Sequence, residues 1–155
     1  MFQQPLLDAN EPASSTLQLP VAMSTGADFH LSALSAEETA HYIDHRLTTA
    51  GGAAGLFEPA AVRFIHYQCG GVPRLINSLC DTALVYGFAS GEQHISAELV
   101  YDLVRERIAN GLFAAVGEAF EAADPEKAME AARENMVRAR NDLGLTAVPV
   151  TAVAQ

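Results

Sequence analysis

Arg74 is the residue of this sequence whose type and position most directly suggest chemistry. It follows Pro73, which favours the first position of a helix, so Arg74 takes the second position. A positive charge there opposes the positive end of the helix dipole, at a cost of about 0.3–1 kcal/mol if exposed. A guanidinium and the free N–H groups of a helix start can also bind an anion such as phosphate together. The alternative is a surface arginine paired with Glu58 or Asp81.

The segment around Arg74, GGVPRLIN at residues 70–77, predicts a tight joint between two helices. Its two glycines allow positive backbone dihedrals, and the proline pushes Val72 towards an extended conformation. Further along the helix, Asn77, Ser78 and Asp81 lie at i+3, i+4 and i+7 from Arg74 and therefore share its side.

Other chemical groups indicate structural roles more than catalysis. His41 and His45 are four residues apart with Asp44 between them, which fits either a metal clamp or an exposed helix face. Cys69 and Cys80 fall on apolar helical faces, which predicts buried, reduced thiols and no metal site. Ser78, Cys80 and Asp81 have no histidine placed by sequence to activate a nucleophile.

His66 lies near the end of a predicted helix, where a partly charged histidine suits the negative end of the helix dipole, so we expect a structural role for it.

Four helices with short glycine-rich joints are predicted to position these groups. The first begins with a capping box formed by Ser35 and Glu38. The second and third begin at prolines, and the fourth begins after Ser96. Apolar residues recur at helical spacing in each helix. In the first they are Ala36, Ala40, Ile43, Leu47 and Ala50. The predicted ranges are 36–50, 59–69, 73–90 and 97–108.

The C-terminal part predicts one or two further helices, a short one over residues 112–123 and a longer one opened by Asp124–Pro125. The longer helix either packs back onto the bundle or binds a partner, and pairs Glu130–Arg133 and Glu134–Arg138 support its outer face. Its apolar seam comprises Met129, Ala132, Met136, Ala139 and Leu143. The predicted organisation is an irregular arm (1–28), a helical domain (29–110), a helical extension (111–144) and a disordered tail (145–155).

Composition excludes several classes of function. The 155 residues carry a formal net charge of −10, and no segment is basic, which disfavours binding to nucleic acid or to an anionic membrane. The apolar runs are shorter than the roughly 20 residues of a transmembrane helix, and the start lacks the features of a secretory signal. We therefore expect a cytoplasmic protein with an all-α fold and flexible termini.

Three stretches, in order, carry a resemblance to a known family. They are GADFHLSALSAEETAHYIDHRLTTAG, LFEPAAVRFIHYQCGGVPRLINSLCDTALVYGFASG and ISAELVYDLVRER, which together cover about half of the sequence. This part resembles the helical lid subdomain of AAA+ ATPases of the general secretion pathway protein A type. The resemblance implies a four-helix lid-type bundle that closes over a nucleotide bound to a separate α/β core.

The resemblance also implies roles for two residues. Arg74 matches the arginine called sensor 2, which in such ATPases reaches the γ-phosphate of ATP. Pro73 would lie near the base and phosphates of the nucleotide. Fixed donors at a helix start suit this role, because negative charge gathers on the transferred phosphoryl group.

The sequence departs from the complete family pattern. It contains no G-x-x-x-x-G-K-[ST] motif and no strand ending in paired acidic residues that could hold Mg²⁺. The stretch QLPVAMST before the matching region lacks the arginine usual in the family, so residues 1–25 look foreign to it. We therefore expect that this chain does not hydrolyse ATP by itself and binds no Mg²⁺.

The predicted function is that of a lid and sensor 2 portion acting with a nucleotide-binding core or a partner subunit. Complete relatives imply ATP as the nucleotide and envelope or secretion machinery as the setting, and an oligomer is compatible with both. The alternative is a non-catalytic helical adaptor that keeps the lid fold as an interaction surface.

Overall fold

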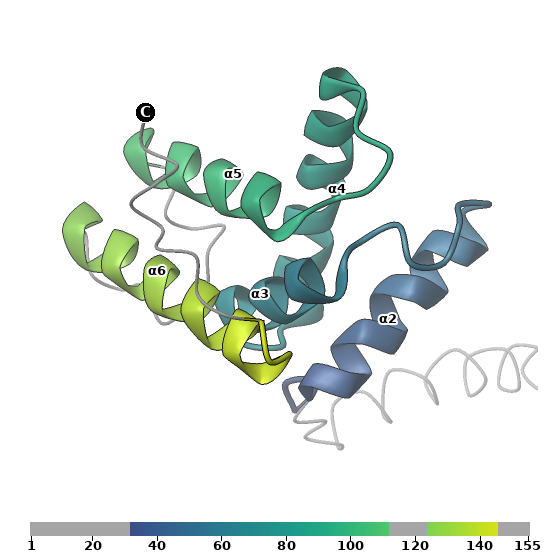
Figure 1. Ribbon diagram of the computed structural model, residues 1–155, viewed down its shortest axis with the longest axis horizontal. Coiled ribbons are helices and arrows are strands. Elements are labelled where there is room, and N and C mark those ends of the chain that lie inside the picture. The colour runs from purple at the N-terminus through teal and green to yellow at the C-terminus, as the bar shows by residue number, and fades with distance from the viewer. Residues whose placement is uncertain (1–31, 112–123, 146–155) are drawn as a thin grey trace, which may run out of the picture. The chain divides into compact units, whose positions relative to one another are not determined.

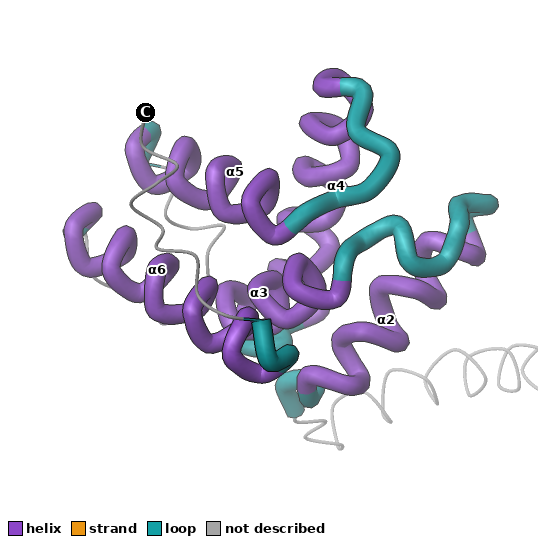
Figure 2. Tube along the Cα trace, in the orientation of Figure 1, coloured by secondary structure: helices purple, strands orange, loops and turns teal. Residues whose placement is uncertain are grey.

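The computed structural model describes residues 32–111 and 124–145, and these form five helices (Figure 1). Their bounds are α2 (Ala36–Thr49), α3 (Pro59–Cys69), α4 (Pro73–Ser90), α5 (Ala97–Ala109) and α6 (Pro125–Asp142). No strand occurs in these two ranges (Figure 2), which confirms the all-α prediction. The predictions for residues 1–28, for a helix over 112–123 and for the tail beyond Leu145 lie outside the described residues.

The helix starts follow the local sequence signals. At the start of α2 the Ser35 N–H donates to Glu38 Oε2 at 2.8 Å, and the Glu38 N–H donates to Ser35 Oγ at 3.2 Å. Ser96 Oγ accepts from the Leu99 N–H at 3.2 Å before α5. Proline occupies the first turn of α3, α4 and α6. The predicted capping box and N-caps are therefore confirmed.

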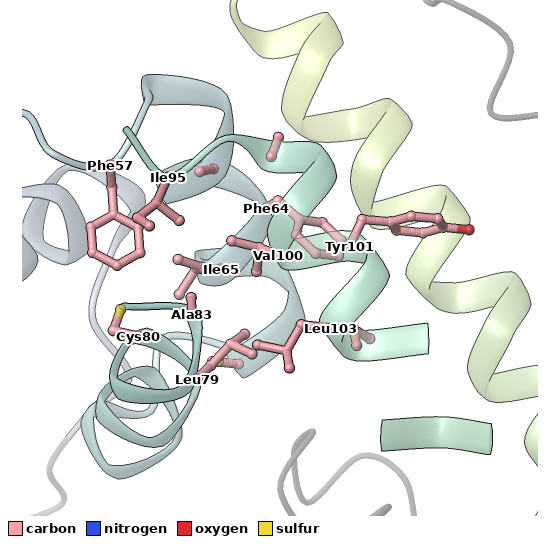
Figure 3. Packing of buried hydrophobic residues seen from close by; sticks show 14 of the residues in the cluster. Phe57, Phe64, Ile65, Leu79, Cys80, Ala83, Ile95, Val100, Tyr101 and Leu103 are labelled. Carbon is pink, nitrogen blue, oxygen red and sulfur yellow. The ribbon is translucent and has the colours of Figure 1, made fainter. Parts of the chain in front are cut away.

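Helix α3 is the centre of the bundle, because it contacts α2, α4, α5 and α6. Phe64, Ile65 and Cys69 are completely buried on it. Figure 3 shows Phe64 beside Tyr101 of α5, with ring centroids 5.9 Å apart and planes tilted by 60°. A helix that contacts four neighbours must be apolar on most of its sides, and six of its eleven residues are buried.

The loops before α3 and α5 pair through a short parallel bridge between Phe57 and Ile95. The Glu58 N–H donates to the Ile95 carbonyl at 3.0 Å, and the Ile95 N–H donates to the Leu56 carbonyl at 2.8 Å. Both bridge side chains point into the core (Figure 3). This bridge joins two segments far apart in sequence and was not predicted.

Helix α6 packs back onto the bundle, against α3 and α5, so the packing alternative for this helix is confirmed. The buried side is made mostly of small residues, which let the helix backbones approach closely. It comprises Ala128, Ala132, Met136 and Ala139. Arg140 pairs with Glu98 of α5, and Asn135 Nδ2 donates to Gln68 Oε1 of α3 at 3.1 Å.

Of the two ion pairs expected on α6, one forms. Arg133 lies 3.4 Å from Glu130. The prediction of a Glu134–Arg138 pair is wrong, because the Arg138 guanidinium lies over the Tyr67 ring, 4.0 Å from its centroid. The aromatic face of α3 offers the cation a contact that a solvent-exposed carboxylate does not match.

The buried face of α2 also differs from the prediction. Of the apolar residues at helical spacing, Ile43 and Leu47 are buried, Ala36 and Ala40 are half-buried, and Ala50 is exposed. Thr39 is completely buried instead. Thr39 satisfies its hydroxyl by donating to the Ser35 carbonyl at 2.8 Å, which makes burial of this polar residue tolerable.

Candidate anion-binding site at the start of helix α4

The joint between α3 and α4 has the predicted tight conformation. Gly70 and Gly71 have φ angles of 58° and 73°, in the left-handed region. The Gly71 N–H donates to the His66 carbonyl at 3.2 Å, which closes the end of α3. Val72 then adopts an extended conformation with ψ of 114°, as expected of a residue before proline.

Gly71 also fixes the joint to the segment that leads into α2. The Leu34 N–H donates to the Gly71 carbonyl at 2.9 Å. A Cβ atom at position 71 would lie 2.3 Å from the Leu34 carbonyl oxygen. This close backbone contact sets where α4 begins relative to α2, and it requires glycine.

Arg74 is exposed on the outer side of the first turn of α4. Within residues 32–111 and 124–145, no ion pair or hydrogen bond involves its side chain. The pairing with Glu58 or Asp81 left open by the sequence does not form. By contrast, Arg63 lies 3.2 Å from Glu37, so the charge of Arg74 is left facing solvent while that of Arg63 is paired.

The backbone of the first turn leaves one donor beside this guanidinium. Pro73 has no N–H, and the N–H groups of Leu75 and Ile76 both donate to the Val72 carbonyl at 3.0 Å. The Arg74 N–H has no described backbone acceptor. The sequence predicted several free N–H groups at this helix start, and among the described residues the structure leaves only that of Arg74.

Two of the polar residues that follow Arg74 on α4, Asn77 and Asp81, lie at a groove between α2 and α4. Asn77 Oδ1 accepts from the Tyr42 hydroxyl at 3.0 Å. Asn77 and Asp81 line a cavity of about 110 Å³ together with Arg46 of α2. The apolar side of this cavity includes Phe57 and Cys80.

The arrangement can bind an anion but contains no machinery for a covalent step. A guanidinium and one N–H can hold phosphate oxygens from one side. Ser78, Cys80 and Asp81 do not form a nucleophilic site, and burial raises the pKa of the Cys80 thiol to about 12. Further groups around the anion would have to come from another surface.

The two histidines of α2 do not belong to a cluster of metal ligands among the described residues. His41 and His45 are exposed, and Asp44 Oδ1 accepts from the Gly55 N–H at 3.2 Å. In the described part of the chain, no group of three or more His, Cys, Asp or Glu side chains is arranged to hold a metal ion.

His66 has a role that the sequence did not reveal. Its Nδ1 lies 3.0 Å from Thr39 Oγ1, which joins α3 to α2. Burial, followed by the charges of Arg63 and Arg138, lowers the pKa of His66. The contact with Thr39 agrees with the structural role expected for His66, whereas the lowered pKa disfavours the charged form that the sequence suggested there. The only sequence signal for this pair was a threonine within the apolar spacing of α2.

The two cysteines are buried and free, as predicted. Burial raises the pKa of each thiol to about 12, so both are unreactive at neutral pH.

No helix among the described residues is long and apolar enough to cross a bilayer.

Comparison with known proteins places this small all-helical chain near one curated protein. It is 37% identical over 95 residues to General secretion pathway protein A of Aeromonas hydrophila. The match covers 61% of this chain but 15% of that protein. No family model matches the sequence, and no solved structure matches it. The similarity agrees with the resemblance found in the sequence, and this chain spans only a small part of the length of that protein.

Proposed function

We propose that this chain acts as the lid and sensor 2 portion of a secretion-type AAA+ ATPase, together with a nucleotide-binding core or a partner subunit in the cytoplasm. The observation that carries the proposal is Arg74, exposed at the start of α4 with no described partner for its charge. The similarity to General secretion pathway protein A supports the class of protein.

The position of Arg74 suits one-sided contact with the terminal phosphate of ATP. A lid closes over its ligand, so its arginine must face outwards in the absence of the core. An inward, paired arginine would first have to break its ion pair. Pro73 is partly buried beside it and would lie near the nucleotide, as the family resemblance implies.

The described residues suit contact with ATP but not with Mg²⁺. Arg74 offers a guanidinium and an N–H, which match phosphate oxygens. Mg²⁺ prefers carboxylates and water, and no cluster of three or more potential ligands occurs in residues 32–111 and 124–145. The proposal therefore assigns phosphate contact to this chain, and assigns Mg²⁺ and hydrolysis to the core.

Calorimetric and NMR titration of the full chain with ATP tests the proposal. We expect dissociation constants of millimolar or tighter, shifts of the amides of residues 70–78, and loss of binding in Arg74→Ala. ADP should bind more weakly, because it lacks the γ-phosphate. Arg133→Ala is the matched control, since Arg133 is an exposed arginine on α6.

ATP binding that survives Arg74→Ala, or equal affinity for ADP, would contradict the sensor role. Absence of any binding by the chain alone would leave the adaptor function or a site completed by a separate core. An adaptor is the second candidate, because α4 exposes large apolar side chains far from Arg74.

A further inference from the structure

The outer side of α4 changes from polar to apolar along its length. Arg74, Ser78 and Asp81 occupy the first half, and Val85 and Phe88 continue the same side at helical spacing. Val85 is 65% exposed and Phe88 is 90% exposed. Tyr86, beside them, is 41% exposed. We call Val85, Tyr86 and Phe88 the Phe88 patch.

The packing of α4 holds the Phe88 patch in solvent. On the opposite side of the helix, Leu79, Ala83 and Gly87 are buried. A Cβ atom on Gly87 would lie 2.3 Å from Ile95 Cδ1, so Ile95 occupies the place of a side chain there. Rolling the helix to bury Phe88 would unpack this contact, and exposure of the patch is therefore a property of the fold.

Three acidic residues lie next to the Phe88 patch in sequence or contact it. Asp81 lies one turn before Val85, and Glu92 follows the end of α4. Glu106 of α5 accepts a hydrogen bond from the Tyr86 hydroxyl at 3.0 Å. The nearby basic residue Arg107 donates to the Thr82 hydroxyl and to the Ser78 carbonyl, and among the described residues it forms no ion pair with these carboxylates.

We propose that the Phe88 patch binds a protein partner whose contacting segment carries apolar side chains flanked by Lys or Arg. A basic flank complements the acidic rim, and the net charge of −10 would draw such a partner towards the chain. A second copy of this chain fits poorly, because pairing two patches would bring their acidic rims together.

This surface is separate from the proposed nucleotide contact. Arg74 and Phe88 are fourteen positions apart, which at 1.5 Å per residue is about 20 Å along the helix. Binding at the Phe88 patch therefore requires neither ATP nor Arg74, and the two proposals can fail independently.

Peptide titration tests this interaction surface. The probe is a synthetic amphipathic peptide of Leu and Lys, and its counterpart carries Glu in place of Lys. Followed by NMR on the full chain, the Lys peptide should shift amides around residues 81–92. Phe88→Ser should weaken its binding about tenfold or more, and the Glu peptide should bind far more weakly. Added salt should also weaken the binding, because the charges involved are exposed.

Three further variants complete the test: two are controls, and one removes charges from the acidic rim. Val137→Ser removes an exposed apolar side chain from α6 and should leave the affinity unchanged. Arg74→Ala should leave it unchanged as well, whereas neutralising the rim with Asp81→Asn and Glu92→Gln should weaken it. Equal binding of both peptides, or no effect of Phe88→Ser in a variant with native circular dichroism, would overturn the proposal. A concentration-dependent dimer that Phe88→Ser abolishes would assign the patch to a second copy instead.

Discussion

The arginines of this chain differ in what their charges contact. Arg63 and Arg140 pair with carboxylates of neighbouring helices, and Arg138 lies on an aromatic ring. Arg74 is exposed, and no described residue pairs with it. A charge kept at an unfavourable helix end without a stabilising contact is the pattern expected of a binding residue, since strain and cost gather at functional positions.

Arg74→Ala should therefore leave stability nearly unchanged. The side chain contributes no described ion pair, so the free energy of unfolding should change by no more than about 0.5 kcal/mol. A small gain is the expected direction, because the charge opposes the helix dipole. Urea denaturation measures the effect. Arg140→Ala is the control and should destabilise by about 1–3 kcal/mol, because it breaks a charged hydrogen bond between α6 and α5.

The lowered pKa of His66 predicts that the folded protein becomes less stable as the pH falls. Burial lowers the pKa of His66 in the folded state below its ordinary value of about 6.5, so the unfolded state binds the proton more readily. The contribution is therefore fully present above about pH 6.5 and is lost as the pH falls through the folded-state pKa.

Denaturation curves between pH 7.5 and 5 check this dependence. His66→Gln should flatten the fall in stability, whereas His94→Gln, at an exposed position, should leave the fall as it is. Identical slopes in the wild type and in His66→Gln would show that another group carries the effect.

At the scale of the elements, the joint before α4 is the most demanding part of the fold. Both glycines have positive φ, but Gly71 alone touches a backbone: a Cβ there would meet the Leu34 carbonyl, and one at Gly70 would meet nothing within 4 Å. Alanine substitutions at Gly70 and Gly71 therefore separate two costs: that of a positive φ angle, which both share, and that of overlap with a neighbouring backbone, which only Gly71 has.

Gly70→Ala should cost about 1–2 kcal/mol, the usual penalty of a left-handed alanine. Gly71→Ala should cost the same plus about 1–3 kcal/mol, because the backbone of Leu34 cannot move aside as a flexible side chain can. Urea denaturation of both variants gives the difference directly. Equal destabilisation would mean that the contact with Leu34 does not fix the start of α4.

The remaining elements follow from local rules. Prolines open three helices, a capping box opens α2, and glycines in the left-handed region close α3 and α4. These signals act within about four residues, so the helix boundaries could be predicted from sequence. The Phe57–Ile95 bridge could not, because it joins loops 38 positions apart that carry no strand pattern.

At the scale of the molecule, α6 completes the core around α3 and α5. Its alanines allow close approach of the helices, so a larger side chain on the buried side has no room. Ala132→Leu should destabilise by about 1–3 kcal/mol through overpacking. Glu134→Leu, on the exposed side of the same helix, should change stability by no more than about 0.5 kcal/mol.

Thermal and urea unfolding of these two variants test whether α6 packs on the bundle in solution. Similar effects of both leucines would contradict the packing, since an undocked helix has no buried side to overfill.

The sequence by itself determined the all-α class, the helix boundaries, the buried thiols and the position of Arg74 at a helix start. Each depends on periodicity, or on caps that act between near neighbours in the chain. Only the tertiary structure decided that Arg74 lacks a described partner, that His66 contacts Thr39, and that α6 packs inwards while Phe88 stays exposed. These outcomes depend on which helix faces meet, and that is set by packing between residues far apart in sequence.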